Sequence, residues 1–179
     1  KTWRDEFTIN NEGIKAGYYY TAARGMDANE EENVLLNHTA GNVEELKAWI
    51  DALNTYSGVN LTLTADIDLT DADLDDDETN DSNWPYELWI AGTVDGGGHS
   101  IKGIKIALGE ECQAAPFNIG STGVVKNLHL KTVDISGIYA GGIATDNYGA
   151  ISGCSVSGSV TTLSSDYSVG GIVNDNSGL

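Results

Sequence analysis

Positive charge is the scarcest property of this 179-residue chain. It has 9 Lys and Arg residues against 27 Asp and Glu residues, which gives a formal net charge of -18. Phosphate backbones and anionic lipid headgroups repel a surface this acidic, which excludes nucleic acid and anionic membrane surfaces as expected partners. The composition is typical of a highly soluble, exposed protein or of one that meets cations.

Long apolar runs are also missing. No stretch approaches the roughly 18 apolar residues that a membrane span needs, so we expect no membrane insertion by this sequence. No signal peptide is visible, but the chain begins at Lys1 without Met and stops at Leu179 within a repeat. We therefore expect truncation at the C-terminus, and the missing signal does not indicate the cytoplasm.

Cysteine and proline are rare, with two residues of each. Cys154 falls at an apolar position of the repeat described below, so we expect a small buried residue there. Cys112 falls in an expected connecting loop. Two separate thiols are favoured over a disulfide, and cysteine usage does not settle the compartment.

Glycine, by contrast, is abundant, with 22 residues, and it marks an internal repeat. Residues 141–150 return 29 positions later as residues 170–179, with six of the ten positions identical. Self-similarity at such a period indicates stacked units, each of which buries its apolar face against the next.

A shorter pattern of three apolar residues also recurs. The second residue follows the first by three positions, and the third follows the second by two positions. It occurs at Ile101, Ile104 and Ile106, at Val125, Leu128 and Leu130, and at Ile151, Cys154 and Val156. The i, i+2 step is strand alternation, and the i, i+3 step indicates a bend between short strands.

These patterns predict an all-β fold, a right-handed parallel β-helix (solenoid) with coils of roughly 25 residues. In this arrangement we expect Ile101 over Val125 over Ile151, and Ile106 over Leu130 over Val156. The alternative is an antiparallel β-sandwich, which needs hairpin turns every 8–12 residues or so instead of a long fixed period.

One segment predicts a helix, about residues 42–53. Asn42 can cap its N-terminus, and Glu44 and Glu45 suit the positive end of its dipole. Trp49 lies on its apolar face, and we expect the helix to cap the open end of the solenoid. The predicted organisation is an extension of strands and loops over residues 1–38, followed by a β-helix domain over residues 39–179.

Three aromatic residues form the best ligand-binding candidates: Trp84, Tyr86 and Trp89. Aromatic rings beside a polar loop can stack on sugar rings. The competing interpretation, that these side chains cover the side of the solenoid, is favoured over binding.

An acidic tract over residues 66–81 contains nine carboxylates and no Lys or Arg. Asp73, Asp75 and Asp77 alternate like the first ligands of a calcium loop, which makes calcium the one candidate cofactor. The glycine and the bidentate glutamate of a complete loop are missing, because Trp84 stands at the glutamate position. A solvated acidic loop is therefore the favoured interpretation.

Other carboxylates are candidates for catalysis only in an alternative function. Asp146 and Asp175 occupy equivalent repeat positions, so stacked coils would place them about 5 Å apart, the separation of a retaining glycosidase pair. A turn at each corner with a stacked ladder of Asn147 and Asn176 is the favoured interpretation. Asp95 begins the glycine-rich segment 95–99, which we interpret as a turn.

The chain resembles bacterial cell-surface and secreted proteins that carry the GLUG motif, common in Bacteroides-type bacteria. The segments that carry the resemblance are 63–69, 92–101 (with Val94 where the family has Phe), 125–128 and the repeats that begin at Gly141 and Gly170. The resemblance implies a β-solenoid at the cell surface, often in lipoproteins or adhesin-like proteins. It implies no catalytic residues.

The leading hypothesis is a non-enzymatic cell-surface or secreted module, adhesin-like or a spacer, that binds a glycan or a host or surface protein. The alternative is a polysaccharide-acting enzyme, a lyase or hydrolase on a β-helix, with carboxylates from Asp95, Asp146 or Asp175. Asp residues together with Lys or Arg on one stacked face would favour the enzyme. The lack of any basic residue after Lys131 counts against it.

Overall fold

A computed structural model describes residues 36–74, 82–85, 88–108, 113–163 and 165–179 of the chain. The predicted extension over residues 1–38 therefore lies almost entirely outside the described residues. None of the helices in the described part has both the length and the apolar character needed to span a bilayer.

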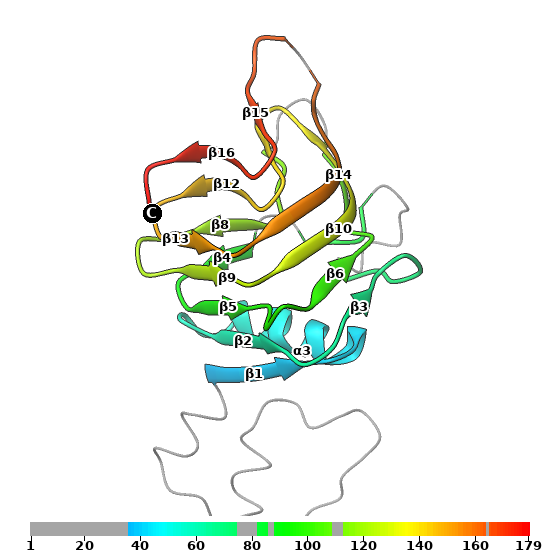
Figure 1. Ribbon diagram of the computed structural model, residues 1–179, viewed down its shortest axis with the longest axis vertical. Coiled ribbons are helices and arrows are strands. Elements are labelled where there is room, and N and C mark those ends of the chain that lie inside the picture. The colour runs from blue at the N-terminus through cyan, green and yellow to red at the C-terminus, as the bar shows by residue number, and fades with distance from the viewer. Residues whose placement is uncertain (1–35, 75–81, 86–87, 109–112, 164) are drawn as a thin grey trace, which may run out of the picture.

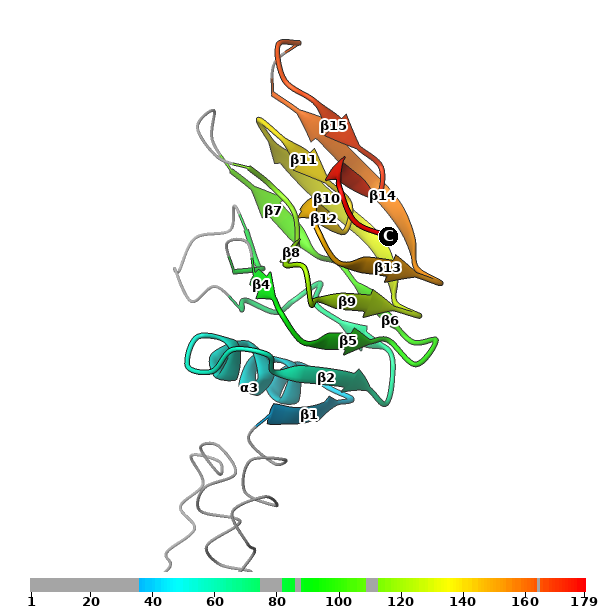
Figure 2. The same cartoon turned by 90° about the vertical axis from the view of Figure 1, so that its left-hand side faces the viewer.

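The described chain is a β-solenoid in which every strand pairing is parallel (Figures 1 and 2). One sheet has the order β1 (Asn37–Ala40), β2 (Asn60–Leu63), β5 (Thr93–Asp95), β9 (Val124–Lys126), β13 (Ala150–Ser152). A second has the order β3 (Ile67–Asp68), β6 (Ser100–Lys102), β10 (His129–Gly137), β14 (Ser155–Thr162), and β7 (Lys105–Ala107) also pairs with β10. The third has the order β4 (Leu88–Ile90), β8 (Phe117–Ile119), β12 (Ala144–Asn147), β16 (Val173–Asn176). A two-stranded sheet pairs β11 (Ala140–Gly141) with β15 (Val169–Gly170).

The coils wind in the right-handed sense that was predicted. In Figure 1 strands β5, β9 and β13 run across the front of the molecule, and β8, β12 and β16 run back behind them as the chain climbs. The predicted all-β, right-handed parallel β-helix with a helix at its N-terminal end is confirmed.

The register of the core differs in part from the prediction. Val125 pairs with Ile151, and Leu130 pairs with Val156, as expected. Ile101, however, pairs with Leu130 instead of lying over Val125, whose partner in the coil below is Val94.

The lengths of the turns explain this error. Residues 96–99 separate β5 from β6, whereas only residues 127–128 separate β9 from β10. With the longer turn, Val94 and Ile101 are seven positions apart, whereas their partners Val125 and Leu130 are five apart, so the three-residue apolar pattern falls on β6 and β7 in one coil and on β9 and β10 in the next. Gly97 and Gly98 have φ of +59° and +83°, so segment 95–99 is the predicted turn, and its conformation requires glycine.

Helix α3 (Val43–Leu53) closes the N-terminal end, as predicted. Asn42 caps it, because its side-chain Oδ1 accepts a hydrogen bond of 2.9 Å from the backbone N–H of Glu45. Trp49 is fully buried and meets Phe117 edge to face, with 6.5 Å between the ring centroids. Strand β1 precedes the helix and pairs with β2, so the solenoid begins at Asn37, two residues before the predicted boundary.

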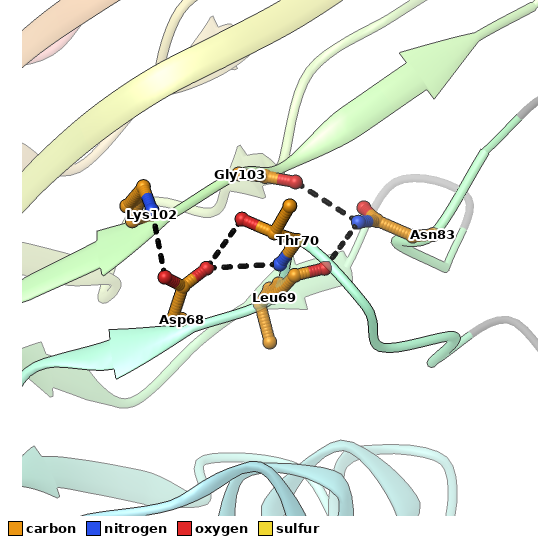
Figure 3. Close-up of polar contacts among 6 residues, drawn as sticks. All are labelled: Asp68, Leu69, Thr70, Asn83, Lys102 and Gly103. Carbon is orange, nitrogen blue, oxygen red and sulfur yellow. Dashed lines mark hydrogen bonds and ion pairs between the residues drawn. The ribbon is translucent and has the colours of Figure 1, made fainter.

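The acidic insertion after Leu69 is anchored to the body of the solenoid where it returns (Figure 3). The side-chain Nδ2 of Asn83 donates to the carbonyl oxygens of Leu69 and Gly103, each at 2.9 Å. Its Oδ1 accepts from the N–H of Lys105 at 2.8 Å. One asparagine therefore joins the end of the insertion to two successive coils and positions the strand that follows, β4.

Candidate contact surface

The sheet of β4, β8, β12 and β16 presents an exposed tryptophan on its outer side. Trp89 is the middle residue of β4, between the buried residues Leu88 and Ile90, and 56% of it is exposed. Strand alternation explains this position, because neighbouring side chains point to opposite faces. Its indole ring lies against Gly120, where a Cβ atom would be 2.8 Å from the ring atom Cζ2.

A second exposed aromatic residue follows β12. Tyr148 is 53% exposed, and its backbone N–H donates to the carbonyl oxygen of Ile119 at 2.9 Å. This bond places Tyr148 beside Gly120 in the ladder. Gly120 therefore lies between the two aromatic residues: the Trp89 ring packs against it from the coil below, and Tyr148 lies next to it in the coil above.

A shallow pocket of about 310 Å³ adjoins Tyr148 at this corner of the solenoid. Its walls include the hydroxyl side chains of Ser121, Thr122 and Ser177. An aromatic ring beside several hydroxyl groups can supply both stacking and hydrogen bonds to a polar ligand.

Two carboxylates stand on the same sheet. Asp146 on β12 pairs in register with Asp175 on β16, and Asn147 pairs with Asn176, as the repeat predicted. Asn147 is 1% exposed, and its Nδ2 donates to Oδ1 of Asn176 at 2.6 Å. The predicted asparagine ladder is therefore confirmed. We call Trp89, Gly120 and Tyr148, with Asp146 and Asp175 beside them, the aromatic face.

Trp84 belongs to the core instead of the surface. Its exposed fraction is 1%, its Nε1 donates to the carbonyl oxygen of Pro116 at 3.0 Å, and its ring meets Phe117 edge to face at 5.9 Å. This burial corrects the candidate role of Trp84 in binding, because a covered ring offers no face to a ligand. Tyr86 lies outside the described residues.

The candidate calcium ligands are only partly described. Asp73 is exposed, whereas Asp75 and Asp77 lie outside the described residues. Within the described ranges, no group of three His, Cys, Asp or Glu side chains is arranged to hold a metal ion. Calcium binding by the acidic tract stays a prediction.

A different set of carboxylates forms ion pairs on the sheets of β5 and β6. Asp68 Oδ2 accepts from Nζ of Lys102 at 2.7 Å, and Lys126 Nζ lies 3.1 Å from Asp95 Oδ2 (Figure 3 shows the Asp68 pair). The hydrogen bond from Lys102, followed by those from Thr70, holds the pKa of Asp68 well below its ordinary value. The N–H of Gly97, with smaller contributions from Asn127 and Lys126, lowers the pKa of Asp95.

The three carboxylates of the enzyme hypothesis are not brought together. Asp95 is on β5, whereas Asp146 and Asp175 are on the sheet of β4, β8, β12 and β16. Asp and Lys are stacked on each of two sheets, an arrangement of the kind that would favour that hypothesis, but there they form ion pairs with each other. A carboxyl whose pKa is lowered stays ionised at neutral pH and is poorly suited to donate a proton.

Sequence analysis did not select Tyr148. The two copies of the repeat contained a signal. Tyr148 in the first copy corresponds to Ser177 in the second, and the flanking Asn and Gly residues are the same in both copies. A bulky aromatic residue at a position where the copies of a structural repeat differ indicates a surface feature that belongs to one coil alone.

Comparisons of this chain with protein-family models, with curated proteins and with solved structures found no match.

Proposed function

We propose that this chain is a non-enzymatic module of a bacterial cell-surface or secreted protein, adhesin-like, that binds glycan through its aromatic face. The observation that carries the proposal is the exposure of Trp89 in the middle of β4 and of Tyr148 just after β12, at 56% and 53%, on either side of Gly120 in the stack. Single exposed apolar residues are common on protein surfaces, so the argument rests on two large rings that flank Gly120 in successive coils, where together they offer a surface for stacking on a sugar.

The resemblance to GLUG-motif proteins supports the cell-surface or secreted location in this proposal. The rigid ladder of the solenoid supports an adhesin-like role, because it holds Trp89 on β4 and Tyr148 at the end of β12, two coils apart, with little conformational entropy to lose on binding. If the aromatic face retains no glycan and no protein, the chain acts as a spacer without a ligand.

The second candidate is a polysaccharide-hydrolysing enzyme, and the pairing of Asp146 with Asp175 favours it. Opposite residues on neighbouring strands lie about 4.8 Å apart, close to the roughly 5 Å carboxyl separation of a retaining glycosidase. Neither aspartate lines the pocket beside Tyr148. A retaining glycosidase needs both carboxylates inside the cleft that holds the scissile bond, whereas a binding surface can extend beyond the pocket to Trp89 and the two aspartates, so this arrangement favours binding over catalysis.

The experiment is a retention assay on immobilised plant and host polysaccharides and matrix proteins, with and without calcium, in which released products are read in the same wells. We expect glycan retention without products, and a roughly tenfold loss of affinity in Trp89→Ala and in Tyr148→Ala. Tyr56→Ala is the matched control, because Tyr56 is 37% exposed in the turn after α3, away from the aromatic face.

Each result separates the candidates. Products that disappear in Asp146→Asn and Asp175→Asn would establish the enzyme. Retention that the Tyr56 variant weakens as much as the Trp89 variant would remove the aromatic face from the proposal. Retention by matrix proteins alone would replace the glycan with a protein ligand.

A further inference from the structure

We infer that the aromatic face selects non-acidic glycans, either neutral or amine-bearing, and rejects glycans that carry uronate, sialate or sulfate groups. This inference rests on the proposed function and names its ligand class. It follows from where the charges lie on the described part of the chain.

The basic residues are segregated away from the aromatic face. The described ranges contain five Lys and no Arg: Lys47 on α3, Lys102 on β6, Lys105 on β7, Lys126 on β9 and Lys131 on β10. None of them is on β4, β8, β12 or β16. Figure 1 shows β8, β12 and β16 on the left and β6 and β10 on the right, whereas β9, which carries Lys126, follows β8 after residues 120–123 and belongs to the adjoining sheet.

Two of the lysines are also engaged by neighbouring carboxylates. Lys102 pairs with Asp68 at 2.7 Å, and Lys126 pairs with Asp95 at 3.1 Å. These pairs cancel the positive charge of Lys102 and Lys126 locally, and Lys131, which is in register with Lys102, lies on the sheet of β6 and β10 instead of the aromatic face.

The aromatic face itself carries negative charge. Asp146 and Asp175 are in register on adjacent strands, and Asp175 is exposed. The strands β4, β8, β12 and β16 contain no lysine or arginine, so an incoming carboxylate or sulfate would meet like charge on this sheet, most directly at the exposed Asp175. The ring faces of Trp89 and Tyr148 accept the apolar face of a neutral sugar and attract an ammonium group by cation–π interaction.

The test is affinity electrophoresis of the whole chain in gels that contain hydroxyethyl cellulose, chitosan or polygalacturonate, run at low ionic strength, where surface electrostatics act over their longest range. We expect retardation by hydroxyethyl cellulose and at least tenfold weaker interaction with polygalacturonate; because a chain of net charge -18 attracts any polycation, retardation by chitosan supports the inference only where Trp89→Ala weakens it. Added salt should reduce this discrimination by screening the two aspartates.

Variants that remove charged side chains show which residues cause the discrimination against polygalacturonate. Asp146→Asn/Asp175→Asn should bind polygalacturonate at least tenfold more tightly than the unmodified chain, and Asp175→Asn alone, at an exposed position, should show part of the gain. Lys102→Gln/Lys126→Gln removes charge from the other sheets and should leave the selectivity unchanged.

The outcomes distinguish this inference from the proposed function. Equal retardation by polygalacturonate and by a neutral or amine-bearing polymer overturns the charge selection and leaves glycan binding intact. Selectivity that persists in both Asp variants overturns the role of the two aspartates. No retardation by any of the three polymers overturns the proposed glycan binding, and the selection with it.

Discussion

Trp84 and Trp89 are five positions apart in the sequence and occupy opposite environments. Trp84 fills the core against Phe117, whereas Trp89 stands on the outer side of β4 against Gly120. The same type of side chain therefore packs in the core at position 84 and is exposed to a ligand at position 89.

We expect Trp84→Ala to lower the free energy of unfolding by about 3–5 kcal/mol, because it leaves a cavity in the core. Trp89→Ala should lower it by about 1–2 kcal/mol, less than Trp84→Ala, because 56% of Trp89 is exposed and the rest of its ring packs against Gly120. Urea unfolding of the two variants measures both values. Equal losses in the two variants would contradict the assignment of Trp89 to the surface.

Ionisation also acts at the scale of single residues, and Asp68 is the clearest case. Its pKa in the folded chain is depressed below the ordinary value of 3.8, by the hydrogen bonds from Lys102 and Thr70. A depressed pKa contributes stability that is present above the unfolded pKa and is lost as the pH falls through the folded pKa.

We therefore expect the free energy of unfolding to decrease as the pH falls below about 4, and to decrease less steeply in Asp68→Asn. Denaturant titrations at a series of acidic pH values provide the measurement. Trp89→Ala is the control, because it removes no ionisable group and should keep the original slope. An unchanged slope in Asp68→Asn would show that the Asp68 hydrogen bonds do not contribute to the pH dependence.

Among the elements, the turns that carry the repeated Gly-Gly pair show how closely successive coils pack. A Cβ atom on Gly142 would collide with the carbonyl oxygen of Gly171 in the coil above. A Cβ atom on Gly171, the equivalent residue, would meet nothing within 4 Å. At the second glycine of the pair the requirement is therefore imposed by the neighbouring coil, whereas a Cβ atom on the first glycine, Gly141, would collide with the carbonyl oxygen of Ala144 in its own turn.

Gly142→Ala should destabilise the chain by about 1–3 kcal/mol, the usual cost of overpacking, because backbone atoms of two coils must separate. Gly171→Ala should be close to neutral in the same thermal or urea unfolding measurement. A Gly171 variant that is as unstable as the Gly142 variant would place the strain within each turn instead of between coils.

For the molecule as a whole, burial decreases along the stack. Ile143 and Asn147 are 0% and 1% exposed, whereas Ile172, which follows the same Gly-Gly pair one coil later, is 40% exposed. Stacked repeats gain stability mainly from contacts between neighbours, so a coil with one described neighbour should open more easily than a coil with two.

Native-state hydrogen exchange should therefore show the strongest protection in β6, β9 and β10 and the weakest in β14 and β16. Peptide-level mass spectrometry resolves these strands. Uniform protection from α3 to β16 would mean that the solenoid opens as one cooperative unit, which contradicts the repeat-by-repeat description.

The sequence alone was sufficient for the features that depend on local chemistry and on period. Asn42 and the apolar face around Trp49 predicted α3, because capping and amphipathicity act within a few residues. The recurrence of Asp146 and Asn147 at Asp175 and Asn176 predicted their stacking, because a repeat of constant length maps equal positions onto each other.

Only the tertiary structure decided the register and the surface. The pairing of Ile101 with Leu130 depends on the unequal lengths of two turns, which the apolar pattern does not record. The burial of Trp84 and the exposure of Trp89 and Tyr148 depend on which side of each strand meets the core, and on the space that Gly120 leaves for the indole ring. These are contacts between residues about 30 positions apart, so they exist only once the coils are stacked.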